Sequence, residues 1–256
     1  MTQQLTILTG ASRGLGLALA EQLLAPQHTL LCISRHRNEA LAERANAQGA
    51  TLLQWTEDLT QGAAVSRELE RWLQAQVGTM FASATLINNA ALISHLAPLS
   101  EADVGDLAQA LRVGLEAPMQ LTAVFLRATA AWPAQRKVLN ISSSVGHRAK
   151  ANQAAYCTVK AGLDHFTRCV ALEEALKANG ARLCALAPGT IDTDMQAQLR
   201  GADQAVFPDR DYFVQLKNGG QLSSPEAAAI RVLVYLARAD FGAQPVADVR
   251  DLVALC

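Results

Sequence analysis

Tyr156 and Lys160 lie four positions apart in the run Ala-Tyr-Cys-Thr-Val-Lys-Ala, inside a segment whose apolar spacing predicts a buried helix. Because a helix returns to the same face after four residues, the phenol and the amine should be neighbours. A free phenol has a pKa near ~10, and a nearby ammonium favours the phenolate and lowers that pKa. The pair is therefore a candidate acid/base device, although tyrosine and lysine at this spacing also occur together by chance on solvated helix faces.

A glycine-rich run, Thr-Gly-Ala-Ser-Arg-Gly-Leu-Gly at residues 9–16, follows the first apolar segment and opens the first predicted helix. Gly10, Gly14 and Gly16 would allow a tight turn and let a pyrophosphate approach the helix N-terminus, whose free N–H groups favour an anion. No Lys-Ser or Lys-Thr pair follows, so the run does not predict a nucleoside triphosphate site. The alternatives that remain are a dinucleotide site and a glycine-rich turn without a ligand.

Two arginines indicate which dinucleotide would bind. An NAD site usually has an acidic residue at the end of the second strand, which holds the adenosine ribose. Here that position reads Ser-Arg-His-Arg, so Arg35 stands where the carboxylate would be, and Arg13 lies within the glycine loop. Two guanidinium groups could bind a 2′-phosphate, which favours NADP(H). The alternative is that both arginines face solvent.

Short apolar runs alternate with stretches of helical period along the whole chain. The runs predict strands at residues 5–9, 28–34, 50–55, 84–90, 137–142, 181–189 and 246–251. Because these strands are almost continuously apolar, helices should cover both faces of a parallel sheet. We therefore predict a single α/β domain over residues 1–256, with a Rossmann-type doubly wound parallel sheet of about seven strands.

One long segment, residues 192–224, shows no clear periodicity and follows the sixth predicted strand. Ligands of open α/β sheets bind outside the carboxyl ends of the strands, and long loops inside compact domains are usually functional. We therefore predict that this segment is a substrate lid. Met195 and Tyr212 within it are candidates for substrate contacts, and the alternative is ordinary packing of the lid.

Composition excludes several classes of protein. The chain has 22 basic and 23 acidic residues, so a surface that binds nucleic acid is not expected. No signal peptide and no run of ~18 apolar residues is present, which predicts a soluble cytoplasmic protein without a membrane partner. The cysteines are far apart and lack the spacing of a metal site, so we expect reduced thiols and no metal. They are Cys32, Cys157, Cys169, Cys184 and Cys256.

Six motifs appear in a fixed order along the chain. They are Thr-Gly-Ala-Ser-Arg-Gly-Leu-Gly (9–16), Asp-Leu (58–59), Asn-Asn-Ala-Ala (88–91), Asn-Ile-Ser-Ser (140–143), Tyr-Cys-Thr-Val-Lys (156–160) and Pro-Gly-Thr-Ile-Asp-Thr (188–193). Over nearly its whole length the chain thereby resembles the short-chain dehydrogenase/reductase family. The stretch from Asn140 to Arg168 and the ending resemble its sepiapterin-reductase and benzil-reductase branch. The resemblance implies NADPH-dependent reduction of a small ketone or vicinal dicarbonyl.

The same resemblance implies roles for individual residues. Tyr156 would donate a proton to the substrate carbonyl, Ser143 would hydrogen-bond the same oxygen, and Lys160 would hold the nicotinamide ribose and lower the pKa of Tyr156. The cofactor-binding residues that we predict are Gly10, Ser12, Arg13, Gly14, Leu15, Gly16, Arg35, Asp58, Leu59, Asn89, Ala90, Tyr156, Lys160, Pro188, Gly189, Ile191 and Thr193.

One departure from the family pattern bears on activity. The predicted fourth helix, residues 102–132, carries Gly114 where the family has an asparagine that helps to hold a proton-relaying water. Glycine inside a helix costs ~1 kcal/mol relative to alanine, which predicts a local kink. The departure leaves open an NADPH-binding module with little or no turnover. A 3-oxoacyl-thioester or steroid reductase is a further alternative.

Two expectations complete the sequence-based description. His147 either reaches the substrate or is a solvated loop residue. The resemblance also implies a homodimer or homotetramer that forms through the fourth helix and the helix that carries Tyr156.

Overall fold

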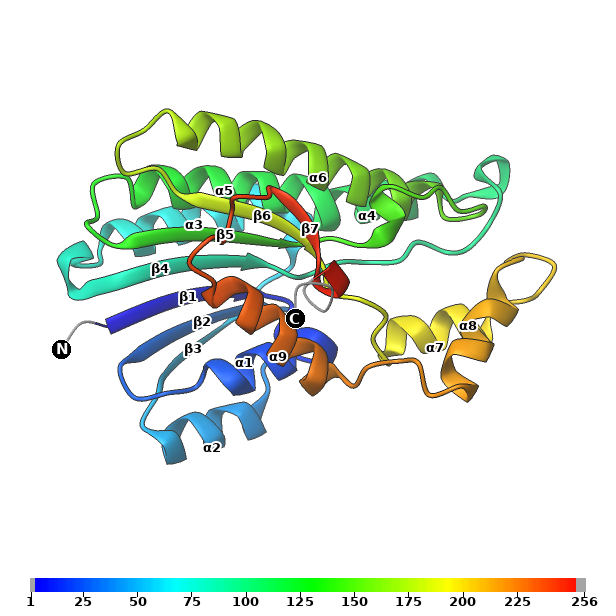
Figure 1. The fold of residues 1–256 in the computed structure, drawn as a ribbon, viewed down its shortest axis with the longest axis horizontal. Helices are drawn as coiled ribbons and strands as arrows, with labels where there is room; N and C mark the ends of the chain where they lie inside the picture. Colours follow the sequence, from blue (N-terminus) through cyan, green and yellow to red (C-terminus); the bar gives the residue numbers. More distant parts are fainter. Residues whose placement is uncertain (1–2, 252–256) are drawn as a thin grey trace.

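The computed structural model describes residues 3–251, which form one seven-stranded parallel sheet between two layers of helices (Figure 1). The predicted Rossmann-type fold is confirmed. The strands are β1 (Gln3–Thr9), β2 (His28–Ser34), β3 (Thr51–Thr56), β4 (Phe81–Asn88), β5 (Gln135–Ile141), β6 (Arg182–Ala187) and β7 (Val246–Asp248). The last two strands are shorter than predicted, because the chain leaves the sheet at Pro188 and, after Asp248, enters a short helical turn.

The order of the strands is β3-β2-β1-β4-β5-β6-β7. The first three strands extend the sheet on one side of β1, and the later strands extend it on the other side, starting with β4. The order of the strands therefore reverses between the neighbours β1 and β4, which are parallel and end at the same edge of the sheet. A reversal of this kind opens a crevice at the carboxyl ends of the strands, where open α/β sheets bind ligands. The glycine loop begins at the end of β1 and so lies at this crevice.

Two apolar cores lie on opposite faces of the sheet. One face is covered by α1 (Gly14–Leu23), α2 (Glu39–Gln48) and α9 (Pro225–Ala237), and the other by α3 (Gly62–Gln74), α4 (Val104–Leu111), α5 (Ala117–Ala128) and α6 (Ala154–Ala175) (Figure 1). The central strands are buried on both faces, which explains their continuous apolar character.

Local sequence signals set some of the helix ends. Ser224 Oγ accepts a hydrogen bond from Ala227 N at 3.2 Å, and Pro225 occupies the first helical position of α9. Gly49, with φ of +65°, ends α2 in the left-handed conformation that glycine adopts without strain.

The predicted fourth helix is divided. Helices α4 and α5 are joined by a π-helical turn, Arg112–Glu116, with Gly114 at its centre. A Cβ on Gly114 would lie only 2.5 Å from Val159 Cγ1 on α6, so this turn and α6 approach each other closely. The predicted kink is therefore present as a wider helical turn, and the reason for the glycine is contact with α6.

The segment 192–224 is not the structureless loop that its lack of periodicity predicted. It contains α7 (Asp194–Gly201) and α8 (Arg210–Asn218), which lie beyond the carboxyl ends of the strands (Figure 1). The buried residues Leu96, Leu199, Phe207 and Phe213 form a small apolar core beneath these helices. Two helices this short give too few turns for a clear periodic signal. That the segment acts as a lid stays a prediction.

Cys32, Cys157, Cys169 and Cys184 are free, and Cys256 lies outside the described residues. Within residues 3–251, none of the helices combines the length and the apolar content that crossing a membrane requires. Leu172 near the end of α6 and Leu176 directly after it are exposed, at 73% and 89%. Assembly through the α4–α5 helix and α6 stays a prediction.

Candidate active site

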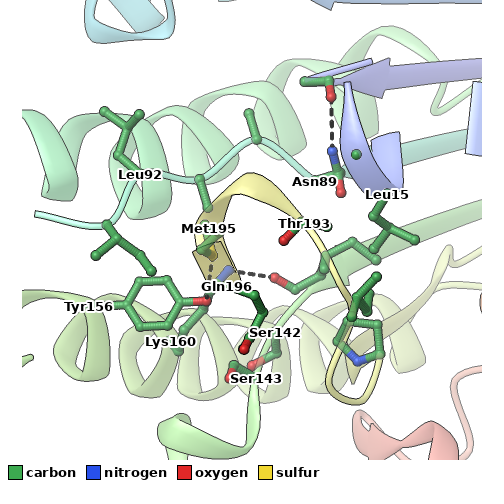
Figure 2. Close-up of a pocket in the computed structure, with 18 of the residues that line it drawn as sticks. Leu15, Asn89, Leu92, Ser142, Ser143, Tyr156, Lys160, Thr193, Met195 and Gln196 are labelled. Atoms are coloured by element: carbon green, nitrogen blue, oxygen red, sulfur yellow. Dashed lines mark hydrogen bonds between the residues drawn. The ribbon is translucent and has the colours of Figure 1, made fainter. Parts of the chain in front are cut away.

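A cavity of about 770 Å³ opens at the carboxyl ends of the central strands and extends beneath α7 and α8. Every predicted catalytic and cofactor-binding residue lines it. Figure 2 shows Ser143, Tyr156 and Lys160 around one part of this space, with Thr193 and Met195 from the segment after β6 beside them. Motifs from the first 16 residues of the chain to residues 188–193 thus meet in one place.

At two of its glycines, Gly10 and Gly16, the glycine loop has no room for a side chain. Gly10 has φ of +72°, and a Cβ there would lie 2.9 Å from Ala90 Cα. A Cβ on Gly16 would lie 2.0 Å from the Gly10 carbonyl oxygen. Ala11 N donates to Ser34 Oγ at 2.8 Å, which ties the loop to the end of β2. Glycines are therefore required for the path of the backbone itself.

The N-terminus of α1 points into this cavity without a capping side chain. Arg13 stands at the N-cap and makes no capping hydrogen bond, and the first turn contains no acidic residue. Free N–H groups and the positive end of the helix dipole together favour an anion. The loop therefore fits the pyrophosphate of a dinucleotide.

The two arginines differ in their surroundings. Arg13 Nη1 lies 3.0 Å from Asp194 Oδ2, so its guanidinium is paired with the first residue of α7. Both side chains are largely exposed. Arg35 is exposed at the rim of the cavity, next to the end of β2. The sequence did not predict the pairing of Arg13, because Asp194 is 181 residues away.

Asn89 braces the glycine loop from the end of β4. Its Nδ2 donates to the carbonyl oxygens of Thr9 and Gly10, at 3.0 and 3.2 Å, as Figure 2 shows in part. The backbone N–H groups of Asn89 and Ala90 both donate to Thr9 Oγ1. These bonds hold the ends of β1 and β4 together at the point where the strand order reverses.

Tyr156 and Lys160 lie on the same face of α6, as predicted. Lys160 Nζ is 5.6 Å from the centroid of the Tyr156 ring and donates a hydrogen bond to the Ile141 carbonyl oxygen at 2.7 Å. The Tyr156 hydroxyl donates to Met195 Sδ at 3.9 Å (Figure 2). Met195 therefore contacts the predicted proton donor, and the lysine is anchored at the end of β5.

The acidity of this pair differs from the prediction. Burial raises the pKa of Tyr156 to about 12, opposed by a hydrogen bond with Ser143. Burial also lowers the pKa of Lys160 to about 8, and the charge of Asp164 opposes that change. This structure therefore shows no lowering of the tyrosine pKa by Lys160, because the loss of solvation outweighs the hydrogen bond with Ser143. At neutral pH Tyr156 keeps its proton.

Ser143 stands at the start of a short helical turn, Ser144–Gly146, directly after β5. Its Oγ accepts a hydrogen bond from Val145 N at 3.4 Å and also interacts with the Tyr156 hydroxyl. The turn therefore holds the serine beside the tyrosine, where both hydroxyl groups can contact one oxygen of a bound molecule.

A buried polar network that the sequence motifs did not predict lies behind the site. Asn88 Nδ2 donates to Asn140 Oδ1 at 2.8 Å, and Asn140 Nδ2 donates to Thr167 Oγ1 at 2.8 Å. The two asparagines are 2% and 0% exposed, so the network joins β4, β5 and α6 within the core. The sequence signal that could have predicted this network is the pair of asparagines, Asn88 and Asn140, at the ends of two apolar runs.

Asp164 is a second buried group that sequence analysis did not identify, although it follows Lys160 by one helical turn. His147 Nε2 lies 3.6 Å from Asp164 Oδ2, and the histidine side chain is 53% exposed. His147 is not among the described residues that line the cavity, so the solvated-loop interpretation agrees better with the structure.

Comparison with known proteins gives consistent findings. The family model for short chain dehydrogenases matches residues 4–204. The chain is 37% identical over 230 residues to an (S)-benzoin-forming benzil reductase of Bacillus cereus, covering 89% of this chain and 92% of the relative. It is 32% identical over 244 residues to a sepiapterin reductase of Xenopus tropicalis, covering 91% and 90%. A crystal structure of an Agrobacterium tumefaciens putative 2-deoxy-d-gluconate 3-dehydrogenase with bound NADP is similar with a TM-score of 0.78 and 25% identity, covering 97% and 95%.

Proposed function

Because this chain belongs to the short-chain dehydrogenase/reductase family and is therefore an oxidoreductase, we propose that it is an NADPH-dependent reductase of small ketones or vicinal dicarbonyls. The observation that carries the proposal is the meeting of Ser143, Tyr156 and Lys160 with the glycine loop around one cavity. The similarity to a benzil reductase and a sepiapterin reductase supports the substrate class.

The cofactor would lie along the edge of the sheet. The free N–H groups of the glycine loop would bind its pyrophosphate, and Arg35, with Arg13, would bind the 2′-phosphate of the adenosine. The bound nicotinamide supplies the hydride. Asn89 would keep the loop in the shape that this binding needs, through its bonds to Thr9 and Gly10.

Tyr156 would supply the proton. Its raised pKa keeps the hydroxyl protonated at neutral pH, which suits donation to a carbonyl oxygen that becomes negative. Ser143 would donate a second hydrogen bond to the same oxygen, where a fixed donor stabilises the growing charge. The ammonium of Lys160, 5.6 Å from the phenol ring, would then stabilise the phenolate that proton transfer leaves.

The cavity lining includes apolar residues beside the polar ones. The apolar residues include Leu92, Ile93, Met195, Tyr212 and Phe213. Such a surface fits the aryl or alkyl groups that flank a dicarbonyl, and the hydroxyl groups of Ser143 and Tyr156 give one point at which a carbonyl oxygen is held.

Turnover can be tested by following the loss of NADPH absorbance with a panel of dicarbonyls, pterins and 3-oxoacyl thioesters. We expect the highest kcat/KM with a vicinal dicarbonyl. Tyr156→Phe removes the proton donor while the ring remains, so kcat should fall about 10²–10⁴-fold. NADPH affinity, measured by fluorescence, should change little.

Two results would contradict the proposal. Tight NADPH binding without turnover of any compound in the panel would favour a binding module, the alternative that Gly114 raises. Preferential turnover of the thioesters would assign a different substrate class to the same catalytic residues.

A further inference from the structure

Asp164 places a buried carboxylate directly behind the proposed catalytic residues. It follows Lys160 by one turn of α6 and Tyr156 by two, so the three side chains share a face. Asp164 is only 1% exposed, and Ser142 Oγ donates a hydrogen bond to Asp164 Oδ1 at 2.5 Å. The carboxylate is thus joined to the residue that precedes Ser143.

The second carboxylate oxygen meets the turn that carries Ser143. Within the described part of the chain, Asp164 Oδ2 is buried and has no hydrogen-bond donor. His147 Nε2 lies 3.6 Å from it, and a Cβ on Gly146 would lie 2.6 Å from it. The same Cβ would lie 3.3 Å from the Lys160 carbonyl, so the turn Ser144–Gly146 lies against α6 at this point.

Several charges meet around these two side chains. Burial raises the pKa of Asp164, and Ser142, His147, Arg168 and Lys160 all act in the opposite direction. Burial lowers the pKa of Lys160, and Asp164 is the charge that opposes this. From β6, the Cys184 thiol also lies within the influence of the carboxylate, which contributes to its raised pKa. Asp164 and Lys160 therefore each favour the charged form of the other.

We propose that Asp164 is a positioning residue of the carbonyl-reducing site, whose carboxylate holds the turn that carries Ser143 and acts as the counter-charge of Lys160. The proposal rests on the proposed function for its catalytic consequence. It does not depend on the identity of the substrate. It also gives the lysine a buried charge of opposite sign, in a chain in which Gly114 offers no side chain to the site.

Removing the charge of Asp164 should change how kcat depends on pH. The negative charge of Asp164 raises the pKa of Lys160, so a neutral residue at 164 should let Lys160 lose its proton at a lower pH. Because the ammonium is needed to stabilise the phenolate, kcat should then begin to fall at a lower pH on the alkaline side. Ser143 should also be held less firmly, which would lower kcat at every pH.

The test compares wild type with Asp164→Asn, which removes the charge and can still accept the hydrogen bond from Ser142. NMR of the full chain labelled at lysine Cε gives the titration of Lys160, and the signal that Lys160→Arg removes assigns it. We expect the Lys160 midpoint to fall by on the order of 1 pH unit, with an equal shift of the alkaline limb of kcat. Asp164→Glu should return both toward wild type.

Glu174→Gln is the matched control. Glu174 lies on the same helix and is also 1% exposed, but it pairs with Arg136 and Lys177 at the far end. The Glu174→Gln substitution should lower the free energy of unfolding without changing the titration midpoint of Lys160. An unchanged midpoint in Asp164→Asn, or an equal shift in Glu174→Gln, would overturn the proposal. If Asp164→Asn does not fold, Asp164→Ser removes the same charge and is judged in the same way.

The lysine titration needs no turnover, so its outcome can be told apart from a failure of the proposed function.

Discussion

Arg35 is the side chain on which the choice between NADPH and NADH should depend most. It is exposed at the rim of the cavity beside the end of β2, whereas Arg13 is already paired with Asp194. Arg35→Asp replaces a phosphate-binding cation with a carboxylate that repels phosphate and can bind ribose hydroxyls. We expect the ratio of kcat/KM for NADPH to that for NADH to fall about 10–100-fold, which corresponds to about 1.4–2.8 kcal/mol.

Arg37→Asp is the control for this prediction. Arg37 is exposed two residues further on and is not among the described residues that line the cavity. The same change of charge there should alter the cofactor ratio only slightly. Equal effects of the two substitutions would mean that net charge, and no specific phosphate contact, sets the preference.

At the scale of single residues, the sequence was sufficient for side chains whose role follows from type and spacing. Tyr156 and Lys160 share a face because helical geometry requires it, and Gly10 and Gly16 are glycines because the backbone approaches another part of the chain there. The acidity of Tyr156 was not predictable in this way. It depends on how much solvent the folded protein removes, which no local spacing encodes.

At the scale of elements, the close approach of Gly114 to Val159 explains why a glycine stands in the π-helical turn that joins α4 and α5. Alanine is the better helix former by ~1 kcal/mol, so a helix without tertiary contacts would gain from Gly114→Ala. Here the added methyl would lie 2.5 Å from Val159 Cγ1, beside Lys160 on α6. We expect Gly114→Ala to destabilise the protein by about 1–3 kcal/mol, measured by urea unfolding.

A double-mutant cycle identifies the cause. Val159→Ala removes the methyl groups that the new Cβ would meet, so Gly114→Ala should cost much less in that background than in wild type. The two changes in stability would be additive if the glycine were required for a backbone reason instead. The cycle therefore separates close packing between the helices from conformational preference.

The elements themselves were predictable to different degrees. Long apolar runs such as β1, β4 and β5 are recognisable because both of their faces are buried. Helices α7 and α8 were missed because each is short and only a few of their residues, such as Leu199 and Phe213, face the small core beneath them. The π-helical turn was predicted only as a kink, since a glycine inside a helix indicates an irregularity and not its form.

At the scale of the whole molecule, α7 and α8 contact the body at few points. Lys150, on the turn before α6, reaches Asp209 Oδ2 at 2.6 Å and lies 5.6 Å from the ring centroids of Tyr212 and Phe213. This ion pair joins the segment after β6 to the loop that leads to Tyr156. It therefore connects the predicted lid to the site that the lid would cover.

Breaking this pair should loosen the segment and leave the sheet unaffected. In Lys150→Ala, we expect backbone amides of residues 194–218 to exchange hydrogen faster while those of β1, β4 and β5 remain unchanged, measured by hydrogen exchange with mass spectrometry. The free energy of unfolding should fall by only about 0–1 kcal/mol, because the pair is partly exposed. If the segment is a lid, KM for the carbonyl substrate should rise more than kcat changes.

Arg127→Ala provides the comparison, because Arg127 Nε is also 2.6 Å from a carboxylate, that of Glu70, at a surface remote from the cavity. It should leave both the exchange of residues 194–218 and KM at their wild-type values. The charge-reversed pair Lys150→Asp with Asp209→Lys should restore slow exchange if the attraction itself holds the segment. Exchange that is equally slow in Lys150→Ala and wild type would show that the apolar core around Phe207 is sufficient to keep these helices in place.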